Sequence, residues 1–307
     1  MGIRPPVRGT ALALAGSIVQ HGAAGHRRIP MPVEDLFQAT LLAEATGYEA
    51  VFVPDHGVWE PFALLASFAQ RTSQLGLATG VVTMTSRSPE VMGTAAATLN
   101  QVSEGRAILG VGSGQERRVD RVASYLDDLR DHRPDGLPLY LAALGDRMVR
   151  LAGARSEGVL LNWCSPARVE RAREEVDRTH PRRVVVAVYV RACLGHEEEH
   201  ALAALREAVG MYAAIPAYRR QLEAEGLGGQ AAAAAEAAGR GDPWAIPEEL
   251  VDALCVRGGR DQALARLDEY RAAGADLVVV YPVTAQEPAS SLMGTIMGAA
   301  PDPSVEA

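Results

Sequence analysis

The sequence predicts a (β/α)8 TIM barrel that forms a single domain over residues 1–307. Eight short apolar runs recur along the chain, and segments with helical periodicity separate them. Polar or glycine-rich residues follow several of these runs, as expected at the carboxyl ends of parallel barrel strands. A chain of 307 residues is also long enough for a barrel of about 250 residues with an insertion.

The expected strands are rich in Val, Leu, Ile and Ala because both faces of a barrel strand are buried. They cover 10–16, 48–53, 75–79, 107–111, 137–143, 158–162, 184–194 and 276–281. The expected helices cover 32–45, 61–72, 89–102, 115–131, 146–154, 166–179, 262–273 and 288–299. Residues 17–31 are expected to form a loop.

The regular alternation breaks after the seventh strand. Residues 197–256 contain helical patterns but no clear strand, so we expect a helical insertion, about 197–246, before the eighth strand. Turn residues support the other boundaries. Pro32 begins the first helix and Gly47 follows its end, and Pro134-Asp135-Gly136 turns the chain before the fifth strand.

Composition excludes several classes of function. A net charge of −8 argues against a nonspecific nucleic-acid binder or a basic membrane-surface protein. All 30 basic residues are arginines, so no lysine can form a Schiff base. The three cysteines are widely spaced and form no C-x-x-C, so we expect reduced thiols in a cytoplasmic protein and no metal site. No apolar run approaches the ~18 residues that a membrane span needs.

Several motifs together resemble the luciferase-like monooxygenase superfamily, a family of flavin- and deazaflavin-dependent barrels. The motifs are residues 47–56, 79–83, 87–89, 99–114, 139–145, 151–162 and 272–282. The chain is most similar to the branch that uses the 5-deazaflavin coenzyme F-420. This resemblance implies hydride transfer between F-420 and a small organic substrate, and a homodimer. Two alternatives stay open: an FMN-dependent monooxygenase that uses reduced flavin, O2 and a flavin reductase partner, and a ligand-binding barrel without catalysis.

The resemblance assigns catalytic roles to three residues. His56 would polarise or deprotonate the substrate, or lie against the deazaflavin ring, because imidazole titrates near neutrality. Trp59 lies one residue closer to this histidine than in the sugar-phosphate enzymes. Glu116 would be the acid, although the position where the sugar-phosphate branch has its acid is Gln115. The alternative is that Asp55 only caps a turn and His56 is an ordinary loop residue.

The resemblance also implies a cofactor site built largely from backbone. The family has a cis non-prolyl peptide at the position of Thr79-Gly80-Val81, and Gly80, Val81 and Val82 would support the back of the ring. Gly112, Ser113 and Gly114, expected at the N-terminus of a helix, offer backbone N–H groups and a hydroxyl to an anion. The other expected cofactor contacts are Asp55, Ala143, Leu144, Gly145 and Asn162.

Other polar residues lie near the expected strand ends without a defined role. Tyr189, Arg191 and Tyr281 face the substrate or pack in the core of the barrel. The arginines between 117 and 121 form a solvated helix face or attract an anionic cofactor tail.

Overall fold

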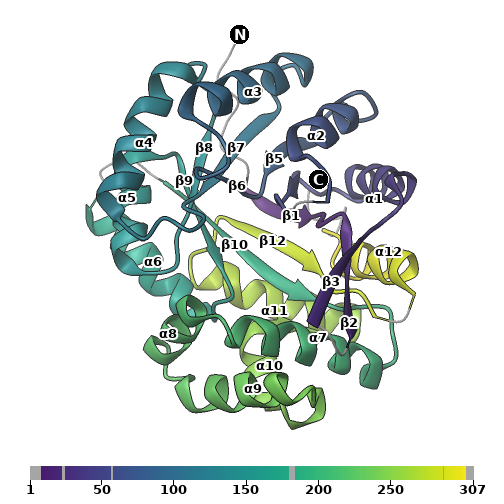
Figure 1. Cartoon of the computed structure of the whole chain (residues 1–307). Coiled ribbons are helices and arrows are strands. Elements are labelled where there is room, and N and C mark those ends of the chain that lie inside the picture. Colours follow the sequence, from purple (N-terminus) through teal and green to yellow (C-terminus); the bar gives the residue numbers. More distant parts are fainter. Residues whose placement is uncertain (1–7, 23–24, 57, 180–183, 286, 302–307) are drawn as a thin grey trace.

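Eight parallel strands close into a barrel in the computed structural model, which describes residues 8–22, 25–56, 58–179, 184–285 and 287–301. Each strand pairs with the next along the chain, and the last pairs with both its predecessor and the first (Figure 1). The barrel strands are β1 (Gly9–Ala13), β4 (Ala50–Val53), β5 (Gly76–Thr79), β7 (Ala107–Gly112), β8 (Leu139–Ala142), β9 (Gly158–Asn162), β10 (Val185–Ala192) and β12 (Leu277–Pro282). The predicted TIM barrel is therefore confirmed.

Helices surround the strands, as the alternating pattern predicts (Figure 1). They are α1 (Val33–Ala45), α2 (Pro61–Ala69), α3 (Pro89–Val102), α4 (Val119–His132), α5 (Asp146–Arg155), α6 (Pro166–Thr179), α11 (Arg260–Ala272) and α12 (Pro288–Gly298). In the described residues no helix is both long enough and apolar enough to cross a bilayer.

The buried side chains form two layers because successive residues of a strand point to opposite faces. In β1, Ala11 and Ala13 belong to the cluster inside the barrel. Leu12, and Leu14 directly after the strand, pack outward against the helices. Small alanines inside the barrel leave room for larger side chains such as Phe52, whose ring centroid lies 6.4 Å from that of Tyr140. The interior is thus a packed core, and a cavity can open only at its ends.

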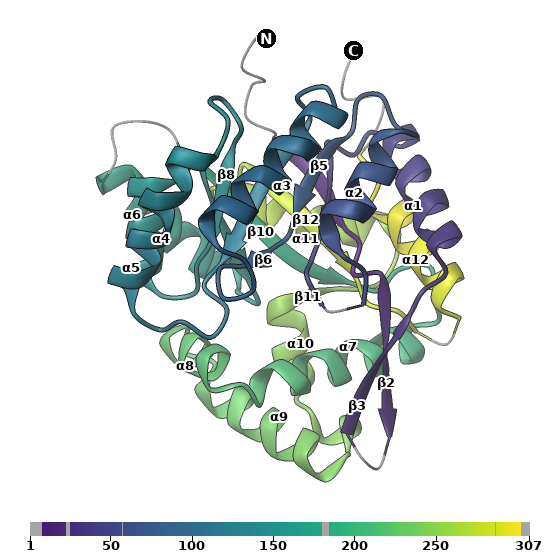
Figure 2. The ribbon, with the colours of Figure 1, turned by 45° about the horizontal axis from the view of Figure 1, so that its top comes forward.

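A helical insertion follows β10, as predicted. It consists of α7 (Glu198–Ala213), α8 (Pro216–Ala224), α9 (Gly228–Arg240), a 3-10 turn (Pro243–Ala245) and α10 (Glu248–Leu254). These helices have a buried apolar cluster of their own. Figure 2 shows them below one end of the barrel, next to a β-hairpin. The insertion therefore covers the side from which the hairpin also extends.

Three predictions of secondary structure are wrong. Residues 17–31, expected as a loop, contain the antiparallel hairpin of β2 (Ser17–Gly22) and β3 (Gly25–Pro30), which is held by backbone pairing that apolar periodicity does not reveal. Helix α4 begins at Val119 and not near residue 115. The short strand β11 (Cys255–Val256) pairs with β10 where no strand was expected. One further two-residue strand, β6 (Val82–Thr83), pairs with β7.

Candidate active site

A cavity of about 430 Å³ opens at the carboxyl ends of the barrel strands. This volume is within the range of about 300–1,000 Å³ that is typical of small-molecule sites. Ten of the predicted site residues line it: Asp55, His56, Gly80, Val81, Gly112, Ser113, Gly114, Ala143, Leu144 and Asn162. They come from the ends of five strands, so the barrel brings together residues far apart in the sequence.

Four predicted site residues do not line the cavity. Trp59 packs against Gly16, where an added Cβ would lie 2.7 Å from the indole Cδ1. Val82 is fully buried in the layer between the strands and the helices. Glu116 accepts hydrogen bonds from the next two backbone N–H groups, each at 2.8 Å. Gly145 is the N-cap residue of α5, directly after the cavity residue Leu144.

His56 lies at the edge of the cavity with a neutral imidazole ring. Burial, and then the positive charges of Arg28 and Arg191, lower its pKa to about 3, against a smaller opposing effect of Asp55. Arg28 Nη1 lies 3.1 Å from His56 Nδ1. A guanidinium can only donate, so Nδ1 accepts and the ring proton is on Nε2. The expectation of a near-neutral pKa is therefore wrong, because the ring is buried and two cations also face it.

Asp55 does not face His56 as a proton acceptor. Its Oδ2 accepts a hydrogen bond from Arg87 Nη1 at 2.9 Å, and Arg87 also pairs with Glu60 at 2.8 Å. Glu60 in turn caps α2 by accepting from the N–H of Ala63 at 2.7 Å. Asp55 thus fixes the loop after β4 to the start of α2 and α3, so the backbone around His56 is held in place.

A cis peptide bond joins Gly80 and Val81, as the family resemblance predicts. Tyr189 Oη donates to the carbonyl oxygen of Gly80 at 2.6 Å, and the N–H of Gly80 donates to the carbonyl of Val53 at 2.8 Å. A Cβ on Gly80 would lie 2.1 Å from Tyr189 Oη, so only glycine fits there. This bulge forms one wall of the cavity and points Val81 toward Gly112, where an added Cβ would lie 2.6 Å from Val81 Cγ2.

Another part of the cavity lining carries hydrogen-bond donors. Ser113 and Arg117 line the cavity in the turn before α4, and this turn separates the Gly112–Gly114 segment from the helix that was expected to begin there. The donors of a helix N-terminus come instead from α5. That helix has no side-chain cap, and Leu144 and Met148 at its start also line the cavity. Free N–H groups at a helix start attract anions.

The cavity lining also includes aromatic and cationic residues to which the sequence assigns no defined role. Arg191 lines the cavity, as do Tyr189 and Tyr281, and its guanidinium carbon lies 4.1 Å from the centroid of the Tyr281 ring. Tyr212 and Tyr218 come from the insertion, and Tyr218 Oη accepts from Asn162 Nδ2 at 2.8 Å. Both tyrosines lie in helices far along the chain, so no local pattern identifies them.

Comparisons with known proteins agree with this geometry. The family model described as luciferase-like monooxygenase matches residues 13–133 and 125–277. A 5,10-methylenetetrahydromethanopterin reductase from Methanolobus tindarius is 27% identical, with 81% of this chain and 90% of that protein covered. An F-420-dependent glucose-6-phosphate dehydrogenase from Beutenbergia cavernae is 33% identical, with 41% of this chain and 52% of that protein covered.

Two solved structures share the fold over nearly the whole chain. A coenzyme F-420-dependent tetrahydromethanopterin reductase from Methanopyrus kandleri superposes with a TM-score of 0.75 at 20% identity, covering 96% of this chain and 98% of that one. An F-420-dependent secondary alcohol dehydrogenase, solved with an F-420–acetone adduct, gives a TM-score of 0.72 at 14% identity, covering 97% and 100%.

Proposed function

We propose that this chain, which belongs to the luciferase-like monooxygenase family, is an oxidoreductase that transfers a hydride between coenzyme F-420 and a small organic substrate. The observation that carries the proposal is a neutral histidine, held as a hydrogen-bond donor, at the edge of a cavity large enough for a cofactor ring. The F-420-dependent relatives in the same family support the choice of coenzyme.

The residues around the cavity fit a ring with an anionic tail. The Gly80–Val81 bulge offers a wall without a protruding side chain at Gly80, on which a flat ring can rest. Ser113, Arg117 and the uncapped start of α5 form a donor-rich wall suited to a phosphate. When bound, the deazaflavin would donate or accept a hydride at a ring carbon.

His56 would act as a hydrogen-bond donor to the substrate. Because Arg28 occupies Nδ1, the proton on Nε2 is the one available to a substrate oxygen or nitrogen. A donor at this atom polarises the bond to carbon and favours negative charge on the heteroatom as the hydride arrives. A pKa of about 3 makes the ring a poor base at neutral pH, so we favour polarisation over deprotonation among the predicted roles.

A titration followed by tryptophan fluorescence tests the coenzyme. We expect the purified protein to bind F-420 more tightly than FMN, and Arg117→Gln to weaken F-420 binding. The matched control is Arg121→Gln, since Arg121 is exposed on α4 and does not line the cavity. Tight binding of FMN alone would instead support the monooxygenase alternative, and binding of neither would support a barrel for another ligand.

A variant of His56 tests the chemistry separately from binding. We expect His56→Ala to lower turnover by at least 100-fold, in the range of a lost transition-state donor, while F-420 affinity changes less than threefold. Unchanged turnover in this variant would remove His56 from the mechanism.

A further inference from the structure

A buried arginine, Arg191, lies at the edge of the cofactor cavity and has no carboxylate partner among the residues that the structure describes. Arg191 is 4% exposed, and its guanidinium carbon lies 4.4 Å from the centroid of the Trp163 ring and 4.1 Å from that of Tyr281. Arg191 Nη1 donates to Asn162 Oδ1. The aromatic rings and the amide orient the guanidinium but do not neutralise its charge.

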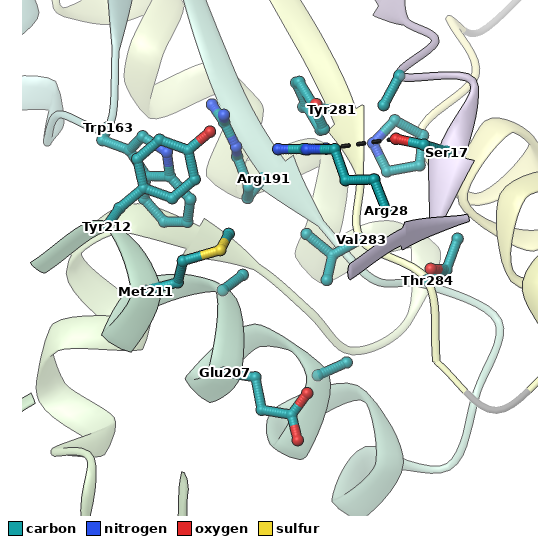
Figure 3. A pocket seen from close by; sticks show the side chains of 14 residues that line it. Ser17, Arg28, Trp163, Arg191, Glu207, Met211, Tyr212, Tyr281, Val283 and Thr284 are labelled. Carbon is teal, nitrogen blue, oxygen red and sulfur yellow. Dashed lines mark hydrogen bonds between the residues drawn. The ribbon is translucent and has the colours of Figure 1, made fainter. Parts of the chain in front are cut away.

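A second arginine extends toward the first from the hairpin. Arg28, on β3, places Nη1 3.3 Å from Ser17 Oγ and 3.1 Å from His56 Nδ1. Figure 3 shows the guanidinium of Arg28 pointing toward Arg191, with Tyr281 beside both. Arg28, Arg191 and Tyr281 also line one pocket.

Neither guanidinium forms an ion pair within the described part of the chain. Asp55 is bound to Arg87 at 2.9 Å. Glu207 lies on α7 at the other end of the same pocket, away from both arginines (Figure 3). Two cations facing one another at a partly desolvated site repel, and each loses hydration, so the arrangement is costly without an anion.

A small pocket lined by both arginines lies next to the cofactor cavity. Its volume is about 90 Å³, and Arg28, Arg191 and Tyr281 line it together with the apolar side chains of Met211 and Val283. Arg191 and Tyr281 also line the larger cavity, so the two spaces meet at these side chains. The pocket therefore combines two guanidinium groups with a short apolar wall.

We propose that the substrate is a short oxo acid whose carboxylate binds between Arg28 and Arg191. A guanidinium matches the planar carboxylate with parallel N–H donors, and the apolar wall suits a short carbon chain. Arg28 contacts His56 directly, so an anion on Arg28 keeps the oxo group within reach of the Nε2 proton.

This inference rests on the proposed function for its redox step. Reduced F-420 would supply a hydride to the carbonyl carbon, breaking the C=O π bond. The proton that the deazaflavin loses on oxidation would be balanced, through water, by the proton that the oxygen takes up. The products are the hydroxy acid and oxidised F-420, and the reverse reaction oxidises the hydroxy acid.

Ligand binding tests the pocket without turnover. We would titrate the protein, alone and with oxidised F-420, with butyrate, 2-oxobutyrate, methyl 2-oxobutyrate and inorganic phosphate, following tryptophan fluorescence and calorimetry. We expect both acids to bind at least 10-fold more tightly than the ester, either to the protein alone or to its complex with oxidised F-420. Trp163→Phe should abolish the fluorescence change but leave the heat of binding, because the Trp163 indole stacks on Arg191.

Variants connect the binding to the two arginines. Arg28→Gln and Arg191→Gln should each weaken the binding of 2-oxobutyrate at least 10-fold. Arg191→Lys should weaken it less, since lysine keeps the charge but lacks the planar guanidinium group. Arg121→Gln, which changes an exposed arginine that lines neither pocket, should leave acid binding within twofold. The acid–ester comparison in the unaltered protein needs no variant to fold.

The remaining outcomes separate this inference from the proposed function. Equal binding of acid and ester, no binding of either, or binding of phosphate alone would overturn the carboxylate site. Loss of F-420 affinity with unchanged acid affinity in the Arg28 and Arg191 variants would also overturn it, by assigning the arginines to the coenzyme. Acid binding with the expected variant effects, but no F-420 binding, would support the carboxylate site while refuting the proposed function.

Discussion

Replacing His56 with glutamine should make the stability of the protein less sensitive to acid. Burial and two nearby arginines lower the pKa of His56 from 6.5 to about 3 in the folded state. Between these values the unfolded chain binds a proton at this site and the folded protein does not. The free energy of unfolding therefore rises with pH across this window, and this stability is lost as the pH falls from 6.5 toward 3.

The magnitude follows from the width of the window. A pH of 4.5 lies two units below 6.5, and each unit corresponds to about 1.4 kcal/mol, so His56 should lower the stability by roughly 3 kcal/mol relative to pH 7.5. Glutamine does not titrate and can still accept a hydrogen bond from Arg28. His56→Gln should lose about 3 kcal/mol less than the unaltered protein over the same interval.

Urea unfolding between pH 4.5 and 7.5 measures this difference. His132→Gln is the matched control, because His132 is exposed at the end of α4. The reasoning is refuted if the unaltered protein and His56→Gln lose the same stability over this interval. An NMR titration of the His56 ring with a midpoint near 6.5 would refute it directly.

Two further predictions concern the bulge at Gly80. Tyr189→Phe removes the 2.6 Å hydrogen bond to the carbonyl oxygen of Gly80 and should cost about 1–3 kcal/mol in urea unfolding, together with weaker F-420 binding; equal stability would show that water replaces the hydroxyl. Gly112→Ala places a Cβ 2.6 Å from Val81 Cγ2 and should lower the free energy of unfolding by about 1–3 kcal/mol. The control is Gly239→Ala, at an exposed position of α9 where an added Cβ meets no atom within 4 Å, and it should raise the free energy of unfolding by about 0.5–1 kcal/mol. Similar melting temperatures for the two alanine variants would contradict this packing argument.

The sequence predicts the barrel well because its evidence is local and repeated. Each strand is an apolar run buried on both faces, and each helix has a periodic apolar side, so every unit carries its own signal. The hairpin at 17–30 lacks such a signal, since backbone pairing holds its strands. The start of α4 was also missed, because Glu116 binds the backbone N–H groups before the helix and delays it.

For the candidate site, too, the sequence predicts some residues correctly and others not. Residues within three positions of a strand end, such as His56 and Gly80, could be named from the sequence because chain position alone places them at the barrel mouth. Trp59 and Glu116 lie a few residues further on, where local packing and capping turn their side chains away from the cavity. Position after a strand is therefore informative for only a few residues.

The sequence by itself determined the barrel, the family resemblance and the backbone wall at Gly80–Val81, because these depend on residues that are close together in the chain. Only the tertiary structure decided the state of His56. Arg28 arrives from the hairpin and Arg191 from β10, and their charges act through space on one imidazole. Burial of the ring and, after it, the two arginine charges lower the pKa of His56 from 6.5 to about 3, and both effects exist only in the folded molecule.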